Sequence, residues 1–595
     1  MNKITKFSTK KFIMSLIFNT AVLIAALLIF HPFFEENDDL QLCMIAEGAF
    51  GNREWHLIYA NILLGKLYVG LGSIFPMIRW HIVLQYTFVF IGYVFGTYVV
   101  SKHKRGTWLS LVAVLSTFYE MYISIQYTKT AAFCCVVGFI LIFEFVRNNT
   151  SFVSADNTSV SYNGGRGSTE NTIFMIVASL LIVYGSLLRP ESFFIAAVPT
   201  LAAGIIELIR TKNIKTYILT LFPVFAVVML LSLVNTKVYD MDDNWSRFMD
   251  YNKARMELND YRYDILDFTK YSEELKSLGV SENDALAILT YQFGDDDIFS
   301  LERFIEIRKP FPERAFGYGT FANLFENLVK ELRKSFILIA GLVGTVLVLV
   351  GTIITDRSKS SPGFIKDSIR KLFYFVMLAL FCGAAVVYFQ YSGRYSHRLF
   401  GAIVVPAIFI TAYIIDSVYI KDNTSKIIFG GNKNDITMPV CLLLAVVLIG
   451  ANGVAYKENI TDFSANYDAN QAMLRELSEI SRDKEALYIG DTFTFNDVYK
   501  YEMFTPFAVG ELNNYVNCGS WYINSPITKQ ITNRFGYANP FSALRSGKDN
   551  VYLLDNGNTE CKLLFLKEHY DNVYEAVKLE NRGGINVYHV QERDK

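Results

Sequence analysis

The stretch FIMSLIFNTAVLIAALLIF at residues 12–30 decides the fold class, and the stretch HPFFEENDD at residues 31–39 follows it directly. The first stretch carries no charge and is long enough to cross the ~30 Å hydrocarbon core of a bilayer as a helix. The second places Glu35, Glu36, Asp38 and Asp39 where this span meets water. A carboxylate is costly in hydrocarbon, so such a cluster must face water or binding partners. We therefore interpret the acidic stretch as a candidate chemical centre at the edge of a membrane.

Uncharged or weakly charged apolar blocks recur along the rest of the chain. The 595 residues are 52% hydrophobic, with a mean hydropathy of +0.26. The blocks are about 17–22 residues long, which is the length of a membrane-spanning helix. The pattern predicts an all-α polytopic transmembrane bundle of about 11 spans, at residues 12–30, 80–100, 108–125, 131–146, 173–188, 193–209, 217–234, 336–355, 372–389, 400–419 and 438–454. The net charge of −1 gives no indication of a nucleic-acid partner.

Basic residues predict the orientation of the bundle. Four lysines precede the first span, no small-residue cleavage site follows it, and the pattern is typical of an uncleaved signal anchor with a cytoplasmic N-terminus. The segment 55–75 is apolar but carries His56, Asn61 and Lys66, and we interpret it as an interfacial helix. With that choice the later basic loops all fall on the inner side, as the positive-inside rule requires. The sequence thus predicts a multi-pass protein of the plasma membrane.

The predicted spans divide the chain into two domains. Residues 1–455 form a transmembrane domain, with a first outer loop at 31–79 that contains interfacial helices and a large outer loop at 235–335. Residues 456–595 form a small extracytoplasmic α/β domain, with helices expected at 470–480 and 560–569 and strands at 486–489, 551–554 and 585–590. This domain has no phosphate-binding glycine loop or metal-ligand spacing. Cys518 and Cys561 could pair there in an oxidising space, and the sequence leaves this open.

Charged residues gather at the predicted outer ends of the spans. They are Glu36, Asp38, Asp39, Lys129, Arg189, Glu191, Arg394, His397 and Arg398. Arginine binds phosphate in a bidentate manner and stays charged, and a carboxylate facing several cations can act as an acid or base beside an anion. A helix through the last three residues would place them on one side. We interpret the set as a cavity that binds a lipid-linked phosphate, with Asp38 or Asp39 as the catalytic base.

The alternative is that these charges are interfacial anchors. We interpret four other acidic residues in or near spans as snorkelling or structurally paired: Glu120, Glu144, Glu207 and Asp416. Arg189 differs from an anchor because it precedes Pro190 at a break between two spans, where freed backbone groups and a charge both need partners. Anchors are usually Lys, Arg, Trp or Tyr, and adjacent aspartates are rare among them. The conjunction favours a binding site.

On these features the chain resembles the C-type (GT-C) membrane glycosyltransferases, which use polyprenyl-phosphate sugars as donors. The matching features are a first span followed at once by the acidic stretch 36–39, interfacial helices within 41–75, the motif at 189–191, and the turn 394–398. The chain also resembles a group of multi-span membrane proteins of unassigned activity from Gram-positive bacteria, in segments 56–68, 252–255 and 279–284. The GT-C resemblance implies that Asp38 or Asp39 is a base or a metal ligand, and a divalent metal stays open.

The leading hypothesis is a glycosyltransferase that moves a sugar from a polyprenyl-phosphate donor to a cell-surface glycan or lipid acceptor on the outer face. Arg189, Arg394 and Arg398 would stabilise the departing lipid phosphate. One rival is a transporter or flippase of a lipid-linked glycan, which would place its charges near the bilayer midplane, often in two repeated halves. Another rival is a non-catalytic membrane protein, because the C-terminal domain carries no assigned chemistry.

Overall fold

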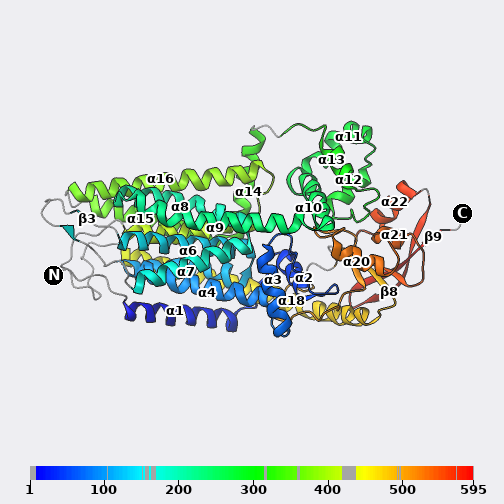
Figure 1. Cartoon of the computed structure of the whole chain (residues 1–595), viewed down its shortest axis with the longest axis horizontal. Helices are drawn as coiled ribbons and strands as arrows, with labels where there is room; N and C mark the ends of the chain where they lie inside the picture. Colours follow the sequence, from blue (N-terminus) through cyan, green and yellow to red (C-terminus); the bar gives the residue numbers. More distant parts are fainter. Residues whose placement is uncertain are drawn as a thin grey trace.

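The computed structural model describes residues 8–103, 105–149, 152–153, 160–161, 169–313, 318–357, 362–417, 437–491, 494, 498–570 and 572–593, and all structural statements below concern these residues. The molecule is elongated, with a bundle of long helices at one end and a smaller part of short helices and strands at the other (Figure 1). We call the end of the bundle that meets this smaller part the head side. Residues 418–419, the end of one predicted span, lie outside the described residues.

Ten long apolar helices confirm the predicted helical membrane bundle. They are α1 (Thr9–Ile29), α4 (Trp80–Ser101), α6 (Tyr127–Asn148), α7 (Thr169–Leu188), α8 (Pro190–Thr211), α9 (Ile214–Asp240), α15 (Phe336–Arg357), α16 (Pro362–Tyr391), α17 (His397–Ser417) and α18 (Thr437–Arg482). An eleventh predicted span corresponds to α5 (Gly106–Phe118), which continues into the π-helix η1 (Tyr119–Ile123). The predicted span 108–125 therefore consists of an α-helix followed by one π-helical turn.

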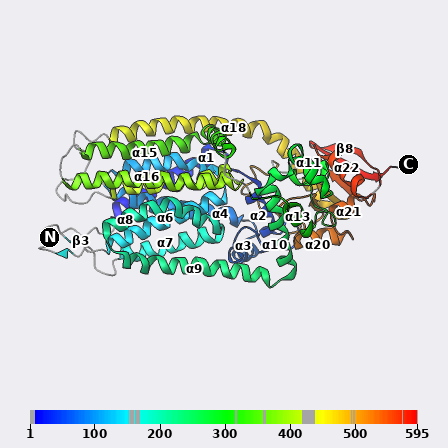
Figure 2. The same cartoon turned by 90° about the horizontal axis from the view of Figure 1, so that it is seen from above.

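Helix α6 lies at the centre of the bundle. It packs against α4, α7, α8 and α17, and 94% of its most apolar 18-residue window is buried. By contrast, α1, α9 and α16 bury at most 22% of theirs and lie on the outside, with α1 and α16 at opposite edges of the bundle in Figure 1 and α9 at one edge in Figure 2. Helices that are apolar but exposed fit a lipid surround rather than water. The central position of α6 matters because its first turn reaches the head side.

The first loop on the head side contains β1 (Phe33–Phe34), α2 (Asn37–Glu47) and α3 (Ile62–Ile74). Strand β1 pairs in parallel with β2 (Ser124–Ile125), directly after the π-helix, and so places the acidic stretch beside the end of the α5 span. Helix α3 has 13 residues, a length of about 20 Å, which is too short to cross a bilayer. The sequence interpretation of residues 55–75 as a non-spanning segment is consistent with this length.

Helix α18 joins the bundle to the C-terminal part without a break. It has 46 residues and a length of about 69 Å, and it runs through position 456, where the change in composition had suggested a domain boundary. A five-stranded sheet follows in the order β6-β5-β7-β9-β8, from β5 (Leu487–Gly490), β6 (Tyr515–Asn517), β7 (Val551–Leu554), β8 (Tyr574–Arg582) and β9 (Ile585–Glu592). Strand β5 is parallel to β6 and β7, and β9 is antiparallel to β7 and β8.

Short helices complete the head. They are α20 (Pro526–Arg534), α21 (Pro540–Leu544) and α22 (Thr559–Tyr570) in the C-terminal part, and α10 (Asp243–Met256), η2 (Glu257–Tyr261), η3 (Tyr263–Leu266), α11 (Phe268–Ser277), α12 (Glu282–Leu289), α13 (Leu301–Arg308) and α14 (Tyr318–Lys334) in the loop after α9. Polar contacts join this loop to the sheet domain. Gln292 Nε2 donates to Asp491 at 2.8 Å, and Lys529 pairs with Asp296 at 2.8 Å. The two segments therefore form one head.

Candidate active site

A cavity of about 560 Å³ lies on the head side, where the first loop, the bundle and the C-terminal part meet. Its lining comes from β1, the start of α2, η1, β2, the end of α14, the start of α17 and a segment after β5: Phe33, Phe34, Glu35, Glu36, Asn37, Leu40, Tyr119, Glu120, Ser124, Lys334, His397 and Lys500. Three carboxylates, two lysines and a histidine share this space. It is large enough for a sugar phosphate.

The four carboxylates of the acidic stretch lie in different environments, because the backbone is extended at Glu36 and helical from Asn37 onward. Glu36 is extended, with φ −136° and ψ 162°, and α2 begins at Asn37, so successive side chains diverge. Glu35 and Glu36 line the cavity. Glu36 is the most exposed of the four, at 33%, whereas Asp38 is 13% exposed and Asp39 is fully buried.

Asp39 faces the interior of the protein, not the cavity. Its Oδ1 lies 2.8 Å from His81 Nε2 and accepts from Gln85 Nε2 at 2.9 Å, while its Oδ2 accepts from the backbone N–H of Tyr127 at 3.1 Å. Tyr127 is the first residue of α6, and a carboxylate is favourable at a helix N-terminus. Asp39 therefore fastens α2 to α4 and α6.

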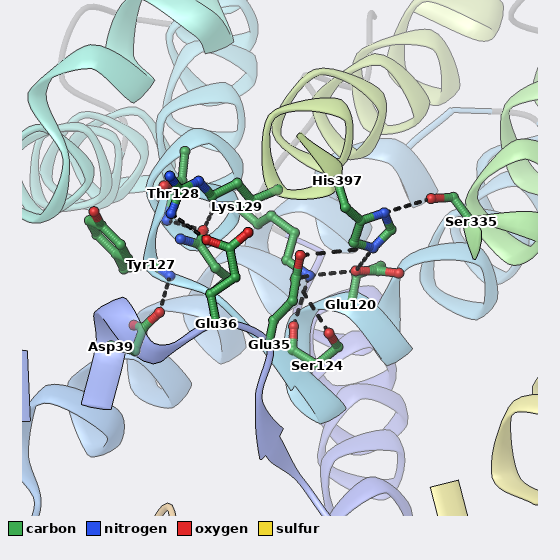
Figure 3. A network of polar contacts seen from close by, with 12 residues as sticks. Glu35, Glu36, Asp39, Glu120, Ser124, Tyr127, Thr128, Lys129, Ser335 and His397 are labelled. Atoms are coloured by element: carbon green, nitrogen blue, oxygen red, sulfur yellow. Dashed lines mark hydrogen bonds and ion pairs between the residues drawn. The ribbon is translucent and has the colours of Figure 1, made fainter. Parts of the chain in front are cut away.

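Lys129 is fully buried at the centre of the polar network in Figure 3. Its ammonium group contacts the carboxylate of Glu35, donates to Glu120 at 2.5 Å, and donates to the carbonyl oxygen of Ser124 at 2.8 Å. The first turn of α6 holds it there, because the Gln126 side chain caps the backbone N–H groups of residues 128 and 129. Lys129 was among the predicted site residues, whereas Glu120 was interpreted as snorkelling or structurally paired.

His397, the first residue of α17, is the second cationic group of this network. Its Nδ1 lies 2.8 Å from Glu331 in the last turn of α14 and 3.0 Å from Ser335 Oγ, the residue between α14 and α15. Its Nε2 faces Glu120 at 3.6 Å and Glu35 at 3.9 Å (Figure 3). The imidazole thus bridges the end of α14 to the carboxylates of the cavity.

Arg398 contacts both Glu36 and Asp38 through one guanidinium nitrogen. Burial raises the pKa of Glu36, the charge of Arg398 lowers it, Asp38 and Glu35 raise it further, and the result is a pKa of about 7. A carboxyl group that titrates near neutral pH can exchange protons during a reaction. The pair of Glu36 and Arg398 therefore combines a potential base with an anion-binding cation.

The remaining predicted site residues lie further from the cavity. Arg189 pairs with the exposed Glu191 at 3.0 Å, contacts the hydroxyl of Tyr127, and stacks over the rings of Tyr127 and Tyr59, each at 5.2 Å. None of these residues lines the cavity. Tyr127 nevertheless connects Arg189 with Asp39, because its hydroxyl contacts Arg189 and its backbone N–H donates to Asp39.

Arg394 belongs to a different contact from Arg398. Helix α17 begins only at His397, after a turn in which Gly393 adopts φ +78°, so Arg394 precedes the helix. It pairs with Asp260 of η2 at 3.0 Å and stacks over Tyr261 at 4.7 Å. The helical side shared by 394, 397 and 398 is therefore not formed, and the structure brings together only His397 and Arg398 at the cavity.

A divalent metal fits this site poorly. Donor atoms of Glu35, Glu120 and His397 lie within 4.8 Å of one another, which is a suitable ligand set by spacing and type. The ammonium group of Lys129, however, already contacts both carboxylates of that set. A metal ion there would meet a buried positive charge, so we derive no reaction step through a metal.

Comparisons with known proteins give one structural likeness. No family model matches the chain, and no curated protein matches it. Among solved structures, the chain is similar to the crystal structure of ArnT from Cupriavidus metallidurans bound to undecaprenyl phosphate, at 10% sequence identity and a TM-score of 0.34, with 98% of each chain covered.

The predicted site residues did not include Glu120, Lys334 and Lys500 of the cavity lining, nor Glu331, which contacts His397 beside the cavity. Glu35 was part of the predicted acidic centre but was not selected as a site residue. Glu35 belongs to the acidic stretch, and its proximity to a span was a usable signal. Glu120 could have been paired with Lys129 across the short turn between two spans. The other three come from segments whose place at the cavity depends on tertiary contacts, and the sequence carries no comparable signal for them.

Proposed function

We propose that the protein is a GT-C-type membrane glycosyltransferase that transfers a sugar from a polyprenyl-phosphate donor to a hydroxyl group of a cell-surface glycan or lipid. The observation that carries the proposal is the cavity at the end of the bundle, where carboxylates and cations meet at the boundary between apolar helices and the polar head. A lipid-linked sugar phosphate needs that combination: an apolar surface for its chain, cations for its phosphate and a base for its acceptor.

The head side would face the outside of the cell. Basic residues at the opposite end of the bundle support this orientation, because positive charge concentrates in cytoplasmic loops. Lys102, Arg147, Arg210, Lys212 and Lys215 all lie near helix ends away from the head. The N-terminus would then be cytoplasmic, and the sheet domain would be extracytoplasmic.

In the proposed reaction Glu36 is the base. It lines the cavity, is the most exposed carboxylate of the acidic stretch and has a pKa of about 7. Glu36 would take the proton of the acceptor hydroxyl as its oxygen bonds to the anomeric carbon. The bond from that carbon to the phosphate oxygen breaks, and its electron pair leaves with the polyprenyl phosphate.

Cations around the cavity would stabilise this leaving group. Arg398 presents a guanidinium group beside Glu36, and Lys334 and Lys500 lie on the cavity lining. Charge-assisted hydrogen bonds from arginine to phosphate are strong and geometrically specific. Asp38 would keep Arg398 in place, and Asp39 would keep α2 in place, so both act as positioning residues. This assignment replaces the choice between Asp38 and Asp39 as base that the sequence suggested.

Loss of one surface sugar tests the proposal. Cells that lack the protein are complemented with wild type, Glu36→Gln, or the matched control Glu273→Gln, which changes an exposed carboxylate on α11. Wild type and the control should restore the sugar, and Glu36→Gln should not. If cells that lack the protein keep an unchanged surface-glycan composition under conditions in which wild-type cells express it, the result would contradict sugar transfer. Uptake of a glycolipid into vesicles without covalent change would favour transport.

A further inference from the structure

Glu35, Glu120 and His397 have the ligand types and the spacing of a transition-metal site. One ligand atom from each lies within 4.8 Å of the others, and a carboxylate–carboxylate–imidazole set suits ions such as Mn²⁺ or Zn²⁺. The three residues come from separate elements, namely the strand β1 region, η1 and α17, so the fold rather than local sequence brings them together. Oε1 of Glu35 is buried without a hydrogen-bond partner and lies 3.9 Å from His397 Nε2.

A lysine lies where the metal would bind. The side chain of Lys129 is 0% exposed, and its ammonium group is held by the Glu35 carboxylate, by Glu120 and by the carbonyl oxygen of Ser124. An ammonium group has three N–H donors, and these three acceptors satisfy them. A charge in this position neutralises part of the carboxylate pair and repels any other cation at close range.

We propose that Lys129 takes the place of a divalent cation in this site, so that the native site is metal-independent and removal of the lysine charge creates a three-ligand metal site. The metal-binding half of this statement concerns the fold alone. The half that concerns catalysis rests on the proposed function. The presence of Lys129 explains why the carboxylates of Glu35 and Glu120 can lie close together in a largely buried site, because the neutralising charge is covalently part of the chain.

Direct metal binding tests the first half. Purified wild type, Lys129→Met and Lys129→Arg are incubated with Mn²⁺, and bound ion is counted by electron paramagnetic resonance while the melting temperature is followed with and without EDTA. Wild type and Lys129→Arg should bind no stoichiometric Mn²⁺, and EDTA should not shift their melting. Lys129→Met should melt lower, bind about one Mn²⁺ per chain and regain stability with it. Adding Glu120→Gln to this variant should abolish that binding.

Lys562 provides a matched control. It is equally buried, at 1%, and its ammonium group lies between Asp491 and Asp555 at 3.0 and 2.7 Å, but in the part of the chain that the structure describes no histidine joins these two carboxylates in a three-ligand group. Lys562→Met should lose stability without gaining stoichiometric Mn²⁺ binding. If Lys562→Met binds as much Mn²⁺ as Lys129→Met, the proposal is overturned, because any two carboxylates that lose their lysine would then bind the ion.

The proposal can also be overturned without any Lys129 variant. If wild type binds one Mn²⁺ per chain and Glu120→Gln removes that ion, the lysine does not replace a metal. This result is valid even if Lys129→Met cannot be purified. Recovery of Lys129→Met only in the presence of Mn²⁺ would support it. Sugar transfer that EDTA abolishes and Mn²⁺ restores would refute metal independence while leaving the proposed function intact. Absence of any transfer would refute the function and leave the metal-binding result valid.

Discussion

Replacing Asp39 by alanine should destabilise the junction between α2, α4 and α6 and leave the chemistry of the folded protein largely intact. The carboxylate is fully buried and holds His81 Nε2 at 2.8 Å, Gln85 Nε2 at 2.9 Å and the Tyr127 N–H at 3.1 Å. Each buried donor left unpaired costs about 1–3 kcal/mol. Because the three donors can partly rearrange, we expect a total loss of about 3–5 kcal/mol, the range for removing one partner of a buried ionic contact.

Glu36→Ala provides the contrast within the same stretch. Its side chain is one third exposed, and exposed ion pairs contribute at most about 1 kcal/mol, so its stability loss should be several-fold smaller than that of Asp39→Ala. Unfolding in mixed micelles of mild detergent and dodecyl sulfate measures both free energies, and far-ultraviolet circular dichroism measures the folded fraction. If Asp39→Ala is as stable as wild type but inactive, the assignment of Asp39 as a positioning residue is wrong, and Asp39 becomes the candidate base.

Three further outcomes are expected. Transfer activity should fall about tenfold per pH unit below pH 7 because Glu36 is then protonated, and Glu36→Gln should remove this pH dependence. Folding raises the pKa of Glu36 from 4.5 to about 7, so the contribution of Glu36 to the free energy of unfolding should decrease as pH rises between those values. On the proposed function, Arg398→Ala should weaken polyprenyl-phosphate binding by about 10–100-fold and Arg398→Lys by less, whereas the exposed Arg534→Ala should not change it. Alkylation of the unreduced, denatured protein should modify all seven cysteines, because Cys518 and Cys561 are both free; two unmodified thiols would indicate that they pair.

The spans were predictable because membrane insertion depends on composition over about twenty residues, which a sequence shows directly. The continuity of α18 was not recognised because polarity changes near residue 455, although no glycine or proline interrupts residues 454–482. In the sheet, β5, β7 and β9 were expected, but β6 and β8 were not. Strand β6 has three residues, too few for an alternating pattern, and β8 is a largely exposed, charged edge strand.

The candidate site was predictable only in part, since it depends on pairs of charges that are distant in the sequence. The position of Lys129 at an outer span end selected it, but its partners Glu35 and Glu120 emerge from the β1–β2 pairing. The same reasoning could not separate Asp38 from Asp39. The helix start at Asn37 decides that difference, because it turns one carboxylate to Arg398 and the other to the interior.

Charge pairing in the cavity suggests how a lipid phosphate could be distinguished from a neutral lipid. Arg398 is already held by Glu36 and Asp38, so a ligand must offer at least as strong an anionic partner to displace one of them. A phosphate meets this requirement and a hydroxyl group does not. Displacement of Glu36 from Arg398 would also free the carboxylate that we propose as base. In the proposed reaction, phosphate binding would itself activate the base, which would confine proton transfer to the moment when a donor is bound.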